Sequence, residues 1–260
     1  MSTDALVIID PQNDFCDPKG SLYVEGAAAD IGRLSRYIIE AGSNISGIFV
    51  SLDSHDEYAI FHPAFWVDDA GRHPDPFIEI TAADFKSGRW TAAAAINKPF
   101  AERTFAILGS RGIESLTVWP EHCIVSTWGH RIADPLVEAL KHWRNKTGLA
   151  VRYVFKGENP YMDQYSAFEG LDDTSPQAAF NKSFFVRLVE FESVTFAGEA
   201  LSHCVQESVL SYLRRLGYAE QRVRLLTDCT SPVKGFDARD SLEMLGQSGV
   251  IFETTESLSA

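Results

Sequence analysis

The chain of 260 residues has few basic residues, few cysteines and no long apolar run. Lys and Arg number 23 against 36 Asp and Glu, and the net charge of -13 disfavours nucleic acid or an anionic membrane surface as a partner. No segment approaches the roughly 20 consecutive apolar residues that a membrane span needs. The four cysteines form no CxxC pair and are too sparse for a disulfide framework, so we expect reduced thiols and a cytoplasmic protein.

The residues that are present predict an α/β fold. Hydrophobic residues make up 45% of the chain and charged residues 23%, which are ordinary values for a globular enzyme. Short apolar runs alternate with amphipathic helical patterns, which predicts a doubly wound, mostly parallel sheet of about six strands with helices on both faces. The predicted strands are residues 5–9, 45–52, 151–155, 193–197, 223–226 and 250–252.

The segment from about residue 67 to 117 breaks this alternation. We predict a single domain over residues 1–260, with this segment as an insertion whose helices or loops could cover the site. No GxGxxG turn follows the first predicted strand, so the chain lacks the phosphate cradle of that dinucleotide-binding fold. In a doubly wound sheet, ligands bind beyond the carboxyl ends of the strands, and the residues that follow each strand are therefore the candidates for chemistry.

Cys204 lies at a predicted turn between the strand at 193–197 and a helical pattern that begins at Val205. Unpaired N–H groups and the positive end of the helix dipole favour thiolate over thiol there, so we expect a lowered pKa and a nucleophile. The same N–H groups could hold an oxyanion. A small buried thiol is the alternative, because free cysteine is among the most buried residue types.

Asp10 and Lys156 follow two other predicted strands. With Cys204 they would form a nucleophilic set without histidine if the three strands are neighbours. Lys156 would favour the thiolate, and Asp10 could take the thiol proton and pass it to a leaving amine. Taken singly, Asp10 could instead cap a helix, and Lys156 could be a solvated charge at the rim.

A second group of polar residues follows the predicted strand at 45–52. Asp53 and His55 come directly after it, His62 is near them, and His122 comes much later in the chain. Imidazole and carboxylate groups suit zinc, manganese or iron. Solvated loop histidines are the alternative, because convergence of the four side chains is not visible in a sequence.

In these residues the chain resembles the cysteine hydrolase superfamily of isochorismatases and nicotinamidases, and the nicotinamidase branch most closely. The resemblance extends over nearly the whole chain and implies an isochorismatase-like, three-layer fold. It rests on residues 10–15, residues 53–55 with His62, residues 119–123, residues 156–157 leading to 163–168, and the turn before Cys204.

The resemblance also implies a catalytic triad of Asp10, Lys156 and Cys204 beside a divalent metal ion. Zinc is the first expectation, with manganese or iron as alternatives, and the metal would engage the pyridine nitrogen of nicotinamide. The implied metal ligands are Asp53, His55, His62 and His122. The implied oxyanion hole is the backbone N–H groups of Ala200 and Cys204 after a non-proline cis peptide at Glu199-Ala200, and the implied substrate contacts are Phe15, Trp119 and Tyr165.

The implied reaction is hydrolysis of nicotinamide to nicotinate and ammonia through a thioester on Cys204, in pyridine nucleotide salvage. The partner would be a small-molecule amide, and family members commonly form homo-oligomers. One alternative is a related hydrolase of another small amide or a vinyl ether, and another is a catalytically silent binding protein. The turn departs from the family pattern, since Leu201-Ser202 stands where Thr-Asp is common.

Overall fold

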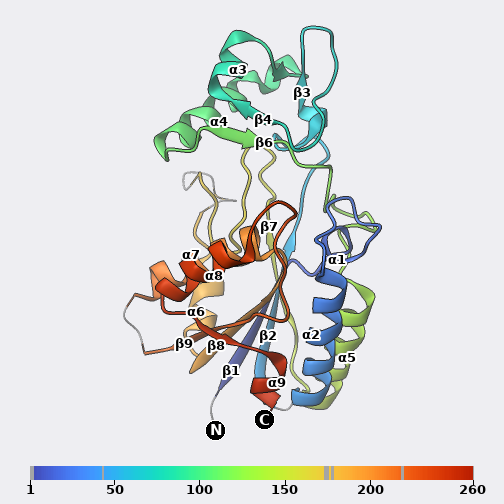
Figure 1. Cartoon of the computed structure of the whole chain (residues 1–260), viewed down its shortest axis with the longest axis vertical. Coiled ribbons are helices and arrows are strands. Elements are labelled where there is room, and N and C mark those ends of the chain that lie inside the picture. Colours follow the sequence, from blue (N-terminus) through green and yellow to red (C-terminus); the bar gives the residue numbers. More distant parts are fainter. Residues whose placement is uncertain (1–2, 43, 173–175, 177–178, 218–219, 260) are drawn as a thin grey trace.

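A six-stranded parallel sheet forms the centre of the protein (Figure 1). The computed structural model describes residues 3–42, 44–172, 176, 179–217 and 220–259. The strands lie in the order β10, β9, β8, β1, β2, β7, and every neighbouring pair is parallel. Their bounds are Asp4–Ile9 (β1), Ile45–Asp53 (β2), Arg152–Lys156 (β7), Ser193–Gly198 (β8), Arg222–Leu226 (β9) and Ile251–Glu253 (β10). The predicted fold class is confirmed.

Helices cover both faces of this sheet (Figure 1). Alternate residues of β1 explain why, because Leu6 and Ile8 belong to the core on one face and Val7 and Ile9 to the core on the other. The first core includes α2 and α5, and the second includes α6, α7 and α8. The helices are Asn13–Cys16 (α1), Ala27–Ala41 (α2), Asp134–Thr147 (α5), Lys182–Leu188 (α6), Gln206–Leu216 (α7), Ala238–Gln247 (α8) and Thr255–Ser259 (α9).

The chain between β2 and α5 places an irregular segment beyond the carboxyl edge of the sheet (Figure 1). Two small antiparallel sheets, β3–β5 and β4–β6, occur in it. Its elements are Pro63–Phe65 (η1), Trp66–Val67 (β3), Glu79–Thr81 (β4), Ala82–Ser87 (α3), Thr91–Ala92 (β5), Ala95–Asn97 (η2), Lys98–Ser110 (α4) and Ser115–Thr117 (β6). Trp66, Phe85 and Phe105 pack together within it. That this segment is an insertion in a single domain stays a prediction.

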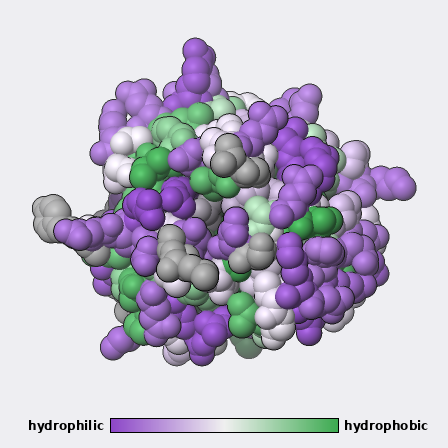
Figure 2. Space-filling model, turned by 90° about the horizontal axis from the view of Figure 1, so that it is seen from below, coloured by the Kyte–Doolittle hydropathy of each residue, from purple (hydrophilic) through white to green (hydrophobic). Residues whose placement is uncertain are grey.

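The opposite end of the molecule is mainly hydrophilic (Figure 2). Hydrophobic side chains on that face form separate patches. Among the helices of the described ranges, none is long and apolar enough to cross a membrane. The large apolar side chains are concentrated in the two cores that flank the sheet.

Candidate active site and metal site

The side chains of Asp10, Lys156 and Cys204 meet beyond the carboxyl edge of the sheet. Lys156 Nζ lies 2.9 Å from Asp10 Oδ2 and 3.4 Å from Cys204 Sγ, and all three residues are buried. Asp10 and Cys204 follow the adjacent strands β1 and β8, whereas Lys156 ends β7, which β2 separates from β1. The three strands are therefore not all neighbours, and the long lysine side chain spans the gap.

Asp53 ends the intervening strand β2 and is a second partner of Lys156. Its Oδ1 atom lies 2.9 Å from Lys156 Nζ. Gln12 holds the backbone of Asp53 through two hydrogen bonds, since Gln12 Nε2 donates to Asp53 O and Asp53 N donates to Gln12 Oε1, each at 2.7 Å. One buried ammonium thus joins two buried carboxylates, Asp10 and Asp53.

Burial and ion pairing compete to set the charges of this group. Burial lowers the pKa of Lys156, but Asp10 and Asp53 outweigh it and raise the pKa well above its usual value. Lys156 therefore stays charged. Burial raises the pKa of Asp10, and the neighbouring Lys156 offsets only part of that rise.

The pKa of Cys204 differs from the sequence prediction. Burial raises it well above the usual value, and the opposing effect of Lys156 is smaller. The predicted lowering was wrong for the resting protein, because the thiol is enclosed and the carboxylates of Asp10 and Asp53 also disfavour a thiolate. The resting group is therefore a thiol that needs a base beside it, and Asp10 occupies that position.

Ser51 and Gln164 hold Asp10 and Lys156 in place, and neither was predicted from the sequence. Ser51 Oγ donates to Asp10 Oδ1 at 2.6 Å and accepts the Asp10 N–H at 3.1 Å. Lys156 Nζ donates to the carbonyl oxygen of Gln164 at 3.1 Å. The signal for Ser51 was a polar residue inside the otherwise apolar run of β2, whereas a backbone contact such as that of Gln164 leaves no mark in the sequence.

Cys204 lies in a π-helical turn, Leu201–Val205, that leads into α7. The preceding peptide Glu199-Ala200 is cis, as the resemblance implied. The carbonyl oxygen of Ala200 accepts the N–H groups of two turn residues, His203 and Val205, each at 3.1 Å. The oxyanion hole at the N–H groups of Ala200 and Cys204 stays a prediction.

Ser202, one of the two residues that depart from the family pattern in this turn, forms hydrogen bonds through its side chain. Its Oγ accepts the N–H of Val233 at 3.0 Å and lies 2.8 Å from Nδ1 of His203. The hydroxyl thus ties the turn to the loop after β9. A serine can therefore link these two segments where the family commonly has an aspartate.

Three of the four predicted metal ligands form a compact group beside Lys156, and the fourth, His62, lies at its edge. The ligand atoms of Asp53, His55 and His122 lie within 4.8 Å of one another, and all three residues are buried. Asp53 Oδ2 is 2.9 Å from His55 Nε2 and 3.7 Å from His122 Nε2. His62 stands outside this compact group, with its Nε2 3.4 Å from His122 Nδ1.

The chemistry of this group fits a metal ion such as zinc. His55 Nδ1 lies 3.1 Å from the carbonyl oxygen of Gly157, which favours a proton on Nδ1 and leaves Nε2 to bind a cation. Burial lowers the pKa of His62 to about 3, so this imidazole is neutral. Burial also lowers the pKa of His55, but the pairing with Asp53 outweighs it and raises that pKa. Carboxylate oxygens and imidazole nitrogens are ligands that zinc uses in proteins. The buried Asp53, His55 and His122 group could therefore bind a metal.

Gly157 shapes the wall of this group. Its φ of 74° is in the left-handed region, and a Cβ atom there would lie 2.4 Å from His55 Cε1 and 2.6 Å from Asp53 Oδ1. Only a glycine therefore fits directly after Lys156 without displacing two candidate ligands.

Aromatic side chains lie beside His122 and beside His203, the residue before Cys204. The ring of Phe15 lies 5.4 Å from that of His122. The rings of Trp119 and Tyr165 each lie 5.3 Å from that of His203, the residue before Cys204. The three predicted substrate contacts thus lie near the two groups, and His203 is a further aromatic residue there.

Two exposed phenylalanines extend this aromatic surface. Phe77, in the segment between β2 and α5, contacts Trp119 at 6.0 Å between ring centroids, and Phe236 contacts His203 at 4.6 Å. Trp119 Nε1 also donates to Asp163 Oδ2 at 3.2 Å. Phe77 therefore brings the irregular segment into contact with Trp119, one of the predicted substrate contacts.

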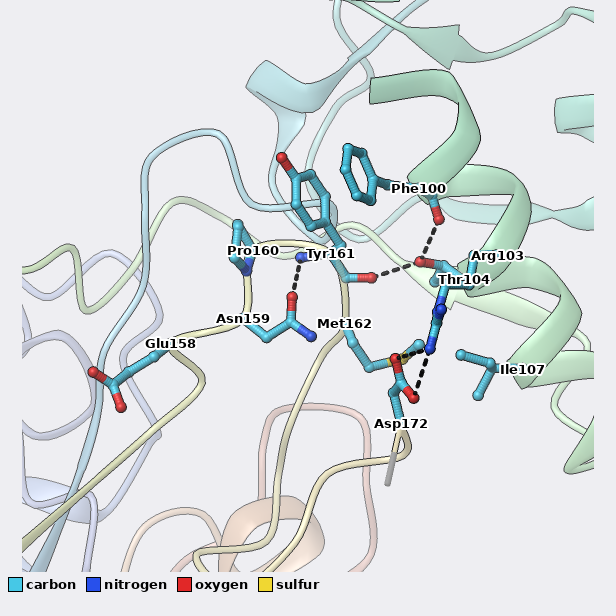
Figure 3. A pocket seen from close by; sticks show the side chains of 10 residues that line it. All are labelled: Phe100, Arg103, Thr104, Ile107, Glu158, Asn159, Pro160, Tyr161, Met162 and Asp172. Carbon is cyan, nitrogen blue, oxygen red and sulfur yellow. Dashed lines mark hydrogen bonds and ion pairs between the residues drawn. The ribbon is translucent and has the colours of Figure 1, made fainter. Parts of the chain in front are cut away.

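A separate pocket of about 390 Å³ lies between α4 and the loop after β7 (Figure 3). The rings of Phe100 and Tyr161 stack at 3.9 Å on one side of it. Thr104 Oγ1 lies 3.0 Å from the carbonyl oxygen of Phe100 and 2.5 Å from that of Tyr161. These contacts join α4 of the irregular segment to the loop that follows Lys156.

Comparison with known proteins finds nicotinamidases and pyrazinamidases among the similar proteins. No family model matches the chain. It is 25% identical over 235 residues to the nicotinamidase of Saccharomyces cerevisiae, covering 88% of each chain. A crystal structure of a yeast nicotinamidase bound to the inhibitor nicotinaldehyde is 21% identical, with a TM-score of 0.70 over 97% of this chain and 100% of that chain.

A third relative was solved with a bound metal ion. The pyrazinamidase of Pyrococcus horikoshii, solved in complex with zinc, is 20% identical and has a TM-score of 0.59 over 96% of this chain and 98% of that chain. These matches extend over nearly the full length of both partners. The chain therefore has the isochorismatase-like hydrolase fold, and its homologues include nicotinamidases and pyrazinamidases.

Proposed function

We propose that the protein is a metal-containing cysteine amidohydrolase that converts nicotinamide and water to nicotinate and ammonia. The observation that carries the proposal is the position of Lys156 Nζ, 2.9 Å from both Asp10 and Asp53 and 3.4 Å from Cys204 Sγ. This one ammonium joins a nucleophile and its base to a group that could bind a metal. Such a reaction would serve pyridine nucleotide salvage.

In this mechanism Asp10 takes the proton of the Cys204 thiol as the sulfur attacks the carboxamide carbon. The C–S bond forms and the carbonyl electrons move to oxygen, where the N–H groups of Ala200 and Cys204 would stabilise the charge. Collapse breaks the C–N bond, and the proton from Asp10 leaves with ammonia. A water molecule then gives a proton to Asp10 and attacks the thioester, which releases nicotinate and restores the thiol.

Lys156 holds both carboxylates and stays positive through these steps, because its pKa is raised by Asp10 and Asp53. Its charge stabilises the thiolate as it forms. Asp53, His55 and His122 would hold a divalent ion, zinc by preference, with His62 beside them. When bound, that ion would supply an electrophilic contact for the ring nitrogen of the substrate.

A different small amide is the second candidate substrate. Phe77 reaches Trp119 from a long segment, and Ser202 replaces a common aspartate, so the mouth of the site has features of its own. A silent binding protein is less well supported, because such a protein has no need for a complete triad. The expectation of a homo-oligomer stays a prediction.

Ammonia release from nicotinamide tests the proposal. We expect metal-loaded wild-type protein to release ammonia, Cys204→Ala to release none, and Cys229→Ala, which removes another buried thiol, to behave as wild type. Benzamide lacks the ring nitrogen and should react far more slowly. Absence of ammonia from nicotinamide with active release from another amide would establish the second candidate. Equal rates for wild type and Cys204→Ala would contradict both.

A further inference from the structure

A second pair of buried acidic residues lies behind the Cys204 turn. Glu199, directly before Ala200, is 0% exposed, and Asp30 of α2 is 2% exposed. Glu199 Oε2 accepts the N–H of Ser231 at 3.1 Å, whereas Oε1 has no hydrogen-bond donor among the described residues. Glu199 and Asp30 share the partner Ser231, whose N–H donates to Glu199 Oε2 and whose Oγ donates to Asp30 Oδ2 at 2.6 Å, so their carboxyl groups are close neighbours. If both carboxyl groups are ionised, neither can donate a hydrogen bond to the other.

Asp30 has the partners of an ionised carboxylate. The guanidinium of Arg33 pairs with its Oδ1, and Ser231 Oγ donates to its Oδ2 at 2.6 Å. Among the residues that the structure describes, no cation forms a salt bridge with Glu199, and Arg33 has only a small effect on its pKa. Cys16 of α1 is also near Glu199, and burial raises the pKa of this thiol well above its usual value, so the thiol is neutral.

A buried carboxyl group with no ion pair keeps its proton in preference to its charge. Burial raises the pKa of Glu199 well above its usual value, and Asp30 raises it further. A protonated Glu199 would supply the missing donor, because its O–H can bind the Asp30 carboxylate while its other oxygen accepts from Ser231.

We propose that Glu199 holds its proton at neutral pH, donates it in a hydrogen bond to Asp30, and thereby positions the turn that carries Cys204. The connection is short. Glu199 accepts from the N–H of Ser231, and the carbonyl oxygen of Ser231 accepts the N–H of Leu201 in the turn at 2.8 Å. Glu199 touches no reacting atom in this scheme, so it is a positioning residue whose effect on catalysis rests on the proposed function.

The first test compares Glu199→Gln with Glu199→Leu. The amide of Gln can donate to Asp30 and accept from Ser231, so we expect kcat to stay within about two-fold of wild type. Leu has a similar volume but no donor or acceptor, so it removes the proposed hydrogen bond to Asp30 and leaves the backbone N–H of Ser231 without its acceptor. For Leu we expect kcat to fall about ten-fold or more with little change in KM. A Leu variant with the kcat of wild type would overturn the positioning role.

Infrared spectroscopy tests the proton itself and needs no substrate. At neutral pH the wild-type protein should show the carbonyl band of a protonated carboxyl group that Glu199→Gln lacks. Asp30→Asn should also lose this band, because it removes the neighbouring charge and frees Arg33 to pair with Glu199. A spectrum in which Glu199 contributes only carboxylate bands would overturn the proposal, even if the Leu variant failed to fold.

The pH dependence of stability gives a third measurement. A carboxyl group whose pKa is raised in the folded state contributes stability that is complete below its unfolded pKa and is lost as pH rises toward the folded value. The free energy of unfolding of Glu199→Gln should therefore rise relative to wild type above about pH 4.5, the usual glutamate value. A constant difference between pH 4.5 and 8 would contradict the raised pKa. If the wild-type protein releases no ammonia, the proposed function fails, while the spectrum and the stability curve still decide the state of Glu199.

Discussion

Gly157→Ala is the substitution for which the structure gives the most detailed expectation. Two effects combine at this position. The backbone has a φ of 74°, which costs an L-residue roughly 1–2 kcal/mol. The new Cβ would also lie 2.4 Å from His55 Cε1 and 2.6 Å from Asp53 Oδ1, and overpacking of this kind costs about 1–3 kcal/mol. The free energy of unfolding should therefore fall by about 2–5 kcal/mol.

Gly148→Ala is the matched control. Gly148 ends α5 with a φ of 73°, and a Cβ there would meet nothing within 4 Å. This variant carries the backbone cost alone, so we expect a loss of roughly 1–2 kcal/mol. The difference between the two variants isolates the effect of pushing His55 and Asp53 apart.

Urea unfolding and metal analysis of both variants complete the experiment. Gly157→Ala should lose bound metal and activity as well as stability, whereas Gly148→Ala should retain both metal and activity. Equal stability losses together with equal metal contents would refute the reasoning, because they would mean that the wall formed by Gly157 does not constrain the ligands.

Three further predictions concern the triad and the metal group. Lys156→Met leaves the buried carboxylates of Asp10 and Asp53 without their cation, so we expect a loss of about 3–5 kcal/mol in unfolding experiments and no measurable turnover; a variant of wild-type stability would contradict the ion pairs. Ser51→Ala removes the O–H donor to Asp10 and should lower kcat about ten-fold with little change in KM, and an unchanged kcat would show that Asp10 needs no such support. Removal of metal by a chelator should lower both the melting temperature and activity, and added zinc should restore them; full activity in metal-free protein would contradict the metal site.

Much of the sheet could be predicted because its central strands, such as β1 and β8, are buried on both faces. The apolar runs at 5–9 and 193–197 became β1 and β8 with limits that shifted by no more than one residue at each end. Such runs differ clearly from the amphipathic helices beside them. The order of the strands could not be predicted in the same way, since pairing depends on contacts between residues far apart in the chain. The position of β2 between β1 and β7 is the example.

The residues of the candidate site could be predicted from the sequence, but their pKa shifts and ion pairs could not. Residue type and position after a strand indicated Asp10, Lys156 and Cys204. The pKa of Cys204 could not be inferred from the helix dipole alone, because burial depends on the side chains that enclose the thiol. The ion pair between Asp53 and Lys156 was also missed, because it depends on the position of β2 next to β7 in the sheet.

Mass spectrometry of a reaction quenched rapidly in acid tests the central claim most directly. Metal-loaded protein would be mixed with nicotinamide, stopped within the first turnover, and digested for peptide mapping. The account predicts a nicotinoyl group on the peptide that contains Cys204 and no adduct on the peptides of Cys16, Cys123 or Cys229. Ammonia release without an adduct on Cys204, or with an adduct on another residue, would contradict it.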